Sequence, residues 1–351
     1  MQDTLALLYW YDRNSRQLPW RTAPSDILSG VKPDPYYVWL SEIMLQQTTV
    51  AAVKGYFELF IKTWPTLADM ANAEEEDILK AWAGLGYYSR ARNLYKCAQF
   101  VQLHHNGRFP EEEERLLKLP GIGPYTAAAI STIAFGRHAA VVDGNVERVL
   151  SRRYGLLTTL PALKAEVKPL MGEMTPHDRP GDFAQAMMDL GATVCTPKSP
   201  ACGICPWLEV CEGRKQGIAD TLPRKAPKKM KPTRRGMAFL LSDESGRILL
   251  RKRADKGLLA GMSEPITTHW ADDAALEDLT AAPIQADWVR TEKDVKHTFT
   301  HFHLEMSVWQ AQAPATYEEP EGYWWSEQHE LEGEALPTVM KKALKVGGLI
   351  S

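Results

Sequence analysis

The sequence lacks any long hydrophobic run, and this absence limits where the protein can work. No stretch of its 351 residues is long and apolar enough to span a membrane. The opening residues, Met1, Gln2 and Asp3, are polar and acidic, and no apolar run follows them, so a signal peptide is not indicated. We therefore expect a cytoplasmic chain with reduced thiols and no association with membranes.

A strong net charge is also missing. The formal charge at pH 7 is −3, which argues against polyanion binding by the whole surface but leaves room for a local basic patch. The charge is uneven, because nine lysines and arginines fall between residues 214 and 235 and the far C-terminal part is acidic. There is no internal repeat, and 351 residues exceed what one hydrophobic core normally serves, so two domains are expected.

Strand signals are scarce in the first part of the chain. Residues 1–216 carry helical periodicity and predict an all-α domain, with helices at 74–82, 90–104, 126–135, 145–154 and 183–190. Residues 217–235 place three prolines among basic residues, which predicts an extended, solvated linker. Residues 236–351 change to short alternating runs with a hairpin signal near 243–246. The expected fold class is multi-domain: an all-α domain, then an α/β (α+β) domain with antiparallel strands.

Cysteine is scarce as well, and four of the five residues form the array Cys195-x6-Cys202-x2-Cys205-x5-Cys211. Four thiolates this close in sequence can hold a metal centre without other ligands. Only Cys202 and Cys205 form the tight pair that zinc sites usually use twice, so the spacing favours an iron–sulfur cluster over zinc. A disulfide is disfavoured in a reducing compartment. Cys97, far from the array, is expected to be a small buried apolar residue.

A glycine-rich turn leads into an amphipathic helix at Leu119-Pro-Gly-Ile-Gly-Pro-Tyr-Thr126. Gly121 and Gly123 would let backbone N–H groups approach a phosphate at the helix N-terminus. A simple turn between helices is the alternative. Because the cysteine array follows downstream, we interpret residues 115–135 as a helix-hairpin-helix that clamps a DNA backbone.

Two carboxylates are candidate catalytic groups. Asp143 precedes an expected helix, where it would serve as an N-cap and would remain ionised. Glu42 shares a helical stripe with Val38 and Leu45, and apolar surroundings would raise its pKa and keep a proton on it. A surface glutamate is the alternative for Glu42. A protonated and an ionised carboxylate together are suited to cleavage at a sugar anomeric carbon.

Combined with a phosphate-binding hairpin, this pair favours cleavage of an N-glycosidic bond in DNA. A base inside a duplex is out of reach, so its nucleotide must be flipped into a pocket. Residues 46–47 and 84–90 supply amide and aromatic groups suited to filling the gap.

These motifs resemble an adenine DNA glycosylase of the MutY type, in the helix-hairpin-helix superfamily that includes endonuclease III. The matching segments span nearly the whole first domain in family order: 18–21, 41–48, 84–88, the hairpin, 142–146, 187–191 and the cysteine array. The resemblance implies one four-iron four-sulfur cluster held by the four cysteines. It also implies removal of adenine opposite 8-oxoguanine or guanine in double-stranded DNA, leaving an abasic site.

By this resemblance, Glu42 would protonate adenine N7, and Asp143 would stabilise the resulting cation or trap it. Asn145 would help to position this chemistry. Tyr125 stands where the endonuclease III branch carries a lysine that forms a Schiff base, and a tyrosine cannot form one. A monofunctional glycosylase is therefore expected, in which Tyr125 orients the carboxylates.

The same resemblance implies roles in DNA contact. Gln47 and Tyr87 would intrude at the mispair. Trp20, Arg21 and Gln185 would line the adenine pocket, although Ala184 replaces an asparagine that is frequent in relatives.

The second domain, residues 236–351, resembles a Nudix-like module that reads 8-oxoguanine. Phe299, Thr300 and His301 match its recognition loop, with threonine in place of the more frequent serine. Leu258 stands where relatives often carry tryptophan. No Arg-Glu-x-x-Glu-Glu segment occurs, so this domain should bind without hydrolysing.

Two other functions compete with this one. The first is an oxidised-pyrimidine glycosylase-lyase on the same scaffold, against which Tyr125 and the second domain argue. The second is a DNA-binding protein without catalysis whose cluster senses redox state, against which Glu42 and Asp143 argue. For the glycosylase we further expect a monomer associated with the bacterial nucleoid, with downstream repair proteins as partners.

Overall fold

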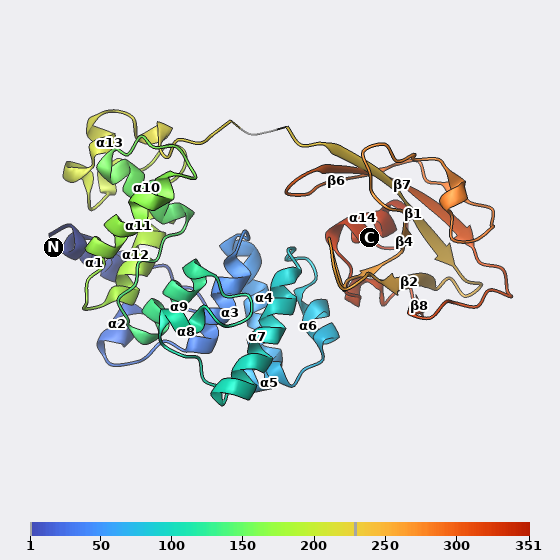
Figure 1. Ribbon diagram of the computed structural model, residues 1–351, viewed down its shortest axis with the longest axis horizontal. Helices are drawn as coiled ribbons and strands as arrows, with labels where there is room; N and C mark the ends of the chain where they lie inside the picture. The colour runs from blue at the N-terminus through green and yellow to red at the C-terminus, as the bar shows by residue number, and fades with distance from the viewer. Residues whose placement is uncertain (1, 228–229) are drawn as a thin grey trace. The chain divides into compact units, whose positions relative to one another are not determined.

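The computed structural model describes residues 2–227 and 230–351 and divides the chain into two compact units (Figure 1). The first unit comprises Met1–Asn72 and Asn93–Pro227, and the second comprises Ala73–Arg92 and Lys228–Ser351. Three predicted positions lie outside the described residues: Met1 of the first domain, and Lys228 and Lys229 of the linker.

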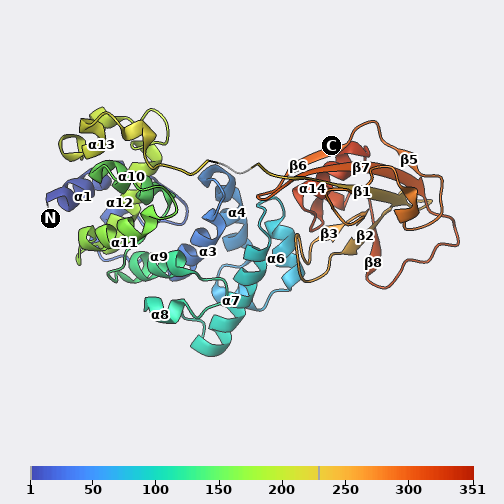
Figure 2. The ribbon, with the colours of Figure 1, turned by 45° about the horizontal axis from the view of Figure 1, so that its top comes forward.

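The first unit is helical, as expected, and its helices vary in length from single turns to the long α7 (Figure 2). Their bounds are α1 Gln2–Asn14, α2 Pro24–Leu28, α3 Pro35–Leu45, α4 Val50–Thr63, α5 Leu67–Ala71, α7 Ser89–His105 (which begins in the second unit), α8 Glu113–Leu116, α9 Pro124–Phe135, α10 Gly144–Tyr154, α11 Leu163–Met174, α12 Pro180–Thr193 and α13 Glu212–Lys215. Short 3₁₀ turns at 202–204, 208–210 and 219–221 complete the unit.

Helix α12 is the central element of the first unit. Every residue from Pro180 to Gly191 is buried, which suits a helix that is apolar on nearly all sides. It packs against α1, α9 and α10, and Phe183, Met187 and Leu190 belong to a core shared with α1, α10 and α11. The few polar side chains on α12 are therefore fixed in position by the core around them.

The second unit is built on a mixed sheet with one helix against it (Figure 1). The strands are β1 Thr233–Ser242, β2 Ile248–Lys252, β3 Ser263–Glu264, β4 Ile266–Thr267, β5 Val289–Arg290, β6 Val295–Thr298, β7 His303–Gln312 and β8 Tyr323–Ser326, with helices α6 Glu75–Trp82 and α14 Thr338–Val346. The expected antiparallel strands are present in six of the described strand pairs, and one pair differs, because β1 and β7 run parallel over their whole length. Alternation of side chains sets which face is buried, but it carries no information on strand direction.

Alternate side chains along the strands point to the two opposite faces of this sheet. Leu304, Met306 and Val308 of β7 pack on one side with the apolar face of α14. Phe239 and Trp309 belong to a second core on the opposite side. The sheet is therefore covered on both faces, and its loops carry the exposed polar groups.

The structure departs from an extended linker in two parts of the predicted range 217–235. Leu222 is 2% exposed, and the backbone of Arg224 accepts a hydrogen bond from Leu160. At the other end, Thr233 already begins β1. Proline and basic residues indicate irregular backbone, but they do not reveal that a leucine between them is buried.

Candidate active site

A cavity of about 1170 Å³ in the first unit is lined by both predicted catalytic carboxylates. Such a volume is larger than most small-molecule pockets and suits a nucleotide with its sugar. The predicted site residues that line it are Trp20, Arg21, Glu42, Gln47, Gly121, Gly123, Tyr125, Asp143, Asn145 and Gln185. The departure at Ala184 does not disturb this arrangement, because Ala184 is fully buried and is not part of the lining.

Glu42 is held inside the fold by α3. The helix begins at Pro35, is capped by the Asp34 carboxylate, and buries Glu42 to 8% exposure. Burial raises the pKa of the Glu42 carboxyl to about 7, against a hydrogen bond from Tyr125 that lowers it. The negative charge of Asp143 adds to the rise, and Arg21 opposes it. Glu42 is therefore buried and not on the surface, and its carboxyl titrates with a pKa near neutral pH.

Tyr125 is the direct partner of this acid. Its hydroxyl donates a hydrogen bond to Glu42 Oε2 over 2.9 Å. Burial raises the pKa of Tyr125 well above its usual value, so the phenol remains a donor at neutral pH. The aromatic side chain expected to orient the carboxylates therefore contacts one of them.

Asp143 is the N-cap of α10, as predicted. Its Oδ1 accepts a hydrogen bond of 2.8 Å from the Val146 backbone N–H, and its Oδ2 accepts one of 2.8 Å from the Asn145 side-chain amide. Both oxygens are thus oriented by donors at the positive end of the α10 dipole.

The predicted hairpin is present as α8, a short turn and α9. Gly121 has φ +74°, and a Cβ there would lie 2.6 Å from the Asn93 Cβ, so glycine is required on both counts. Gly123 is the N-cap of α9 and provides no side chain to occupy the first turn. The N-terminus of α9 therefore remains available to an anion such as a DNA phosphate.

Gln47 and Tyr87, the two residues expected to intrude at the mispair, share an unusual backbone. Both have positive φ, +58° and +48°, although neither is glycine. Such strain persists only where the surrounding structure imposes it, and it gathers at functional sites. Gln47 lines the cavity of the first unit, whereas Tyr87 belongs to the second unit.

Within the second unit, the predicted lesion-reading residues come together. Phe299, Thr300 and His301 line a cavity of about 410 Å³ that Tyr87 also lines. The hydroxyl groups of Tyr87 and Thr300 lie 3.3 Å apart. The Phe299 ring stacks on Phe302 at 4.8 Å between centroids, which orders the loop. Hydroxyl and aromatic groups therefore converge on one surface of this unit.

Two functional residues were missed from the sequence. Asp189 is fully buried and accepts hydrogen bonds from Arg21 at 2.8 Å and from Arg16, so it fixes Arg21 in the cavity wall. Arg148 donates to Asn145 Oδ1 at 2.8 Å and to the Cys195 carbonyl at 2.8 Å. Asp189 lies in the 187–191 motif, and that motif is the signal in the sequence that could have indicated it. Its hydrogen-bond partners, however, are more than 160 positions away along the chain, so no local pattern connects them.

The four array cysteines line one cavity, as their spacing predicts. Arg152 donates a 3.4 Å hydrogen bond to Cys195 Sγ, which suits a thiolate. Among the described residues, no three His, Cys, Asp or Glu side chains gather closely enough to hold a single ion. Cys97 is fully buried elsewhere, as expected.

Comparison with known proteins decides the family. An adenine DNA glycosylase of Homo sapiens is 36% identical in an alignment that covers 97% of this chain and 73% of that protein. The chain belongs to the adenine DNA glycosylase family. Another adenine DNA glycosylase, from Mycobacterium tuberculosis, is 35% identical over 80% of this chain and 88% of its own length. Members of this family are hydrolases that act on N-glycosyl bonds.

Family models match three segments of this adenine DNA glycosylase family member. They describe an HhH-GPD superfamily base excision DNA repair protein over residues 40–172, the iron–sulfur binding domain of endonuclease III over 195–211, and a NUDIX domain over 237–346. The chain thus carries an iron–sulfur cluster site, and the choice of cluster over zinc is confirmed.

Solved structures agree on the fold of the first part. A thermostable thymine-DNA glycosylase matches with a TM-score of 0.53 and 28% identity, over 61% of this chain and 95% of that one. A non-covalent endonuclease III–DNA complex matches with a TM-score of 0.50 and 25% identity, over 61% of this chain and 94% of that one.

Among the described residues, no helix has the length and hydropathy of a membrane span.

Proposed function

We propose that the protein removes adenine paired with 8-oxoguanine or guanine in duplex DNA and leaves an abasic site. One observation carries this proposal: a carboxyl group with a pKa of about 7, bonded to a buried tyrosine, shares a cavity with an oriented aspartate. An acid that is still protonated near neutral pH beside a charged carboxylate is the pair that glycosidic cleavage needs.

The chemistry follows from what each group does to the bond. Glu42 gives its proton to adenine N7, so the base leaves neutral and the electrons of the C1′–N9 bond go with it. Asp143 then stabilises the cationic sugar, by charge or by a transient ester. Asn145 and the Val146 N–H hold the Asp143 oxygens in place throughout. Water then attacks C1′, displacing the ester if one has formed, and its proton passes to the Glu42 carboxylate, which completes the abasic site and restores the acid.

We further propose that the protein cuts no strand. Tyr125 cannot form an imine with the sugar. Lys164 is the single lysine among the described lining residues of the cavity, and its side-chain nitrogen lies 3.3 Å from the Glu147 carboxylate. Borohydride trapping should give no strong adduct, and a strong adduct would contradict this assignment whether or not it survives Lys164→Ala.

Preference for 8-oxoguanine is assigned to the second unit. Tyr87 and Thr300 present hydroxyl groups 3.3 Å apart, beside Phe299 and His301. Thr300→Val keeps the shape and removes one hydroxyl, so discrimination between A opposite 8-oxoguanine and A opposite G should narrow by roughly tenfold. Thr316→Val, an exposed loop position, is the matched control. Unchanged discrimination in Thr300→Val would reject the role.

The cluster is proposed to be a single four-iron four-sulfur group on Cys195, Cys202, Cys205 and Cys211. When bound, such a group crosslinks the segment that these cysteines share. A broad visible absorption band and about four irons per chain would support this count; one zinc and no visible band would contradict it. We propose that the protein acts as a monomer in the bacterial nucleoid and passes its abasic product to other repair proteins.

One assay tests the activity itself. Duplexes with A opposite 8-oxoguanine, A opposite G, or an oxidised pyrimidine are incubated with protein and analysed with and without alkali. Breaks that require alkali and occur only at adenine support the proposal. Glu42→Gln should abolish them, whereas Glu173→Gln, on the exposed surface of α11, should not. Breaks at the oxidised pyrimidine without alkali would favour a glycosylase-lyase, and no breaks at all would favour a DNA-binding protein without catalysis.

A further inference from the structure

One buried acid of the catalytic cavity has no part in the chemistry proposed above. Glu147 lies in the first turn of α10, is buried, and lines the cavity that also contains Glu42 and Asp143. It follows Asp143 by four positions, so the two side chains lie on the same face of the helix. A buried carboxylate is stable only with a partner, and the partner of Glu147 indicates what this wall of the cavity can bind.

The partner is Lys164, in the first turn of α11. Its side-chain nitrogen lies 3.3 Å from a Glu147 carboxylate oxygen, and within the described part of the chain neither side chain has another ion pair or hydrogen bond. The side chain of Lys164 is 65% exposed, whereas that of Glu147 is 9% exposed. Lys164 therefore lines the cavity where it meets solvent.

Lys164 differs from the other cations of this cavity. The cationic side chains among its described lining residues are Arg16, Arg21 and Lys164. Both arginines bond to the fully buried Asp189 and are mostly buried themselves. A lysine side chain has three N–H donors, and one contact with a carboxylate leaves the others for a second anion.

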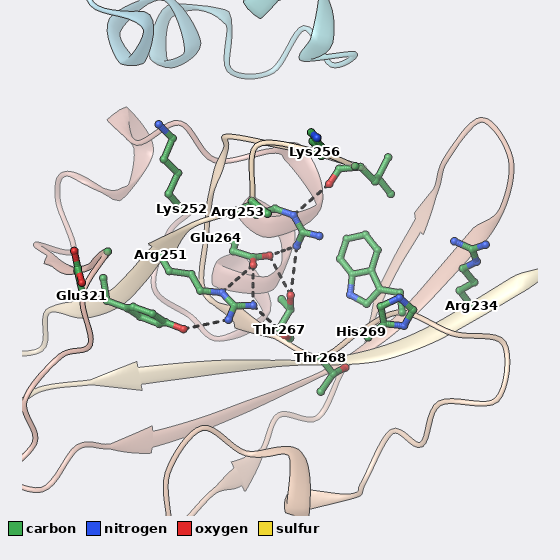
Figure 3. A pocket seen from close by; sticks show the side chains of 16 residues that line it. Arg234, Arg251, Lys252, Arg253, Lys256, Glu264, Thr267, Thr268, His269 and Glu321 are labelled. Atoms are coloured by element: carbon green, nitrogen blue, oxygen red, sulfur yellow. Dashed lines mark hydrogen bonds and ion pairs between the residues drawn. The ribbon is translucent and has the colours of Figure 1, made fainter.

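Figure 3 shows, in the second unit, a cation whose donors are used internally. Arg251 donates to Glu264 at 3.0 Å, to the Tyr323 hydroxyl at 3.1 Å and to the Thr267 carbonyl at 3.2 Å. Lys164 instead has a single contact, at a distance near the long limit for a hydrogen bond. A ligand can therefore bind Lys164 without breaking an internal network.

The position of Lys164 in its helix also favours an external anion. Helix α11 begins at Leu163, so Lys164 lies at the positive end of the helix dipole, where a cation is unfavourable. Glu147 offsets part of this repulsion, and a second negative charge would offset more. A phosphate at this point would interact favourably with both the lysine and the dipole.

We propose that Lys164 binds the backbone phosphate next to the flipped nucleotide and that Glu147 orients the lysine nitrogen toward the cavity. The inference rests on the proposed function, because base removal requires that nucleotide to enter the cavity. Its phosphodiester then lies at the opening, where Lys164 is exposed. The charge of Glu147 also repels the phosphate, so this residue limits the strength of the contact that it orients.

Duplex binding by the full chain tests the contact without base removal. The probe is a duplex with a tetrahydrofuran abasic analogue opposite guanine, compared with an undamaged duplex of the same length. Lys164→Met should weaken binding of the analogue duplex on the order of tenfold and lower its salt slope by about 1. Lys164→Arg keeps the charge and should restore both. Lys168→Met, at an exposed position of α11 outside the cavity lining, is the matched control and should change neither.

Glu147→Gln distinguishes this role from a purely structural ion pair. Glutamine still offers Lys164 an acceptor but does not repel the phosphate, so affinity for the analogue duplex should rise by roughly threefold. If the pair only joined α10 to α11, loss of either partner would weaken binding. Weaker binding in both variants, no loss in Lys164→Met, or an equal loss on the undamaged duplex would overturn the proposal. Neither duplex carries a mispaired adenine, so failure here and failure of the glycosylase assignment are separate results.

Discussion

Replacement of Glu42 by glutamine should make the protein more stable at alkaline pH while it abolishes base removal. In the folded protein the Glu42 carboxyl has a pKa of about 7, against 4.5 for an unburied glutamate, and burial is the main cause. Between these two values the folded state binds a proton that the unfolded state has released. Stability contributed by this group is therefore complete below pH 4.5 and is lost as pH rises through 7.

The size of the effect follows from the same two values. Each unit of pKa difference is worth about 1.4 kcal/mol. The span from 4.5 to about 7 therefore corresponds to about 3 kcal/mol of unfolding free energy, an amount comparable with a buried cavity mutation. Glutamine keeps the shape and an acceptor for the Tyr125 hydroxyl but does not ionise. The unfolding free energy of the variant therefore does not include this loss at high pH.

Urea unfolding of the first unit at several pH values measures the difference directly. The stability gap between Glu42→Gln and the parent protein should widen by about 2 kcal/mol from pH 5.5 to 8. The other titrating groups are the same in both proteins, so their contributions cancel in the difference between the two unfolding free energies. A gap that stays constant across this range would mean that the carboxyl is ionised at neutral pH and would remove the general acid from the mechanism.

Three further perturbations have defined outcomes. Tyr125→Phe removes the hydrogen bond that lowers the pKa of Glu42, so the alkaline limb of the single-turnover pH profile should move to higher pH; a shift to lower pH would contradict the geometry. Arg148→Gln should slow excision at least about tenfold by loosening the amide that orients Asp143, with duplex affinity nearly unchanged in a filter-binding assay. Gly121→Ala should lower the free energy of unfolding by about 2 kcal/mol in thermal unfolding and should weaken binding of undamaged duplex. Unchanged stability and binding would show that a Cβ at position 121 does not collide with Asn93.

Local patterns predicted the local parts of the site. The side-chain cap at Asp143, the glycine at the positive-φ position 121 and the apolar stripe around Glu42 each depend on residues within a turn or two along the chain. Contacts between distant segments could not be read in this way. Asp189 meets Arg21 only because α12 runs through the core, and β1 meets β7 in parallel only after a long excursion of the chain.

The division of the chain was beyond sequence patterns for the same reason. Residues 73–92 cluster with the C-terminal residues 228–351, although they contain a helix as the first unit does. Composition changes mark where a chain alters its secondary structure. They do not mark which half of the molecule a segment packs against.

A continuous series of hydrogen bonds runs from Asp143 through Asn145 and Arg148 to the backbone carbonyl of Cys195. The orientation of this carboxylate therefore depends on the position of the cysteine segment. Any group that fixes the four cysteines would also hold Asp143 in place from the far end of helix α10's first turn.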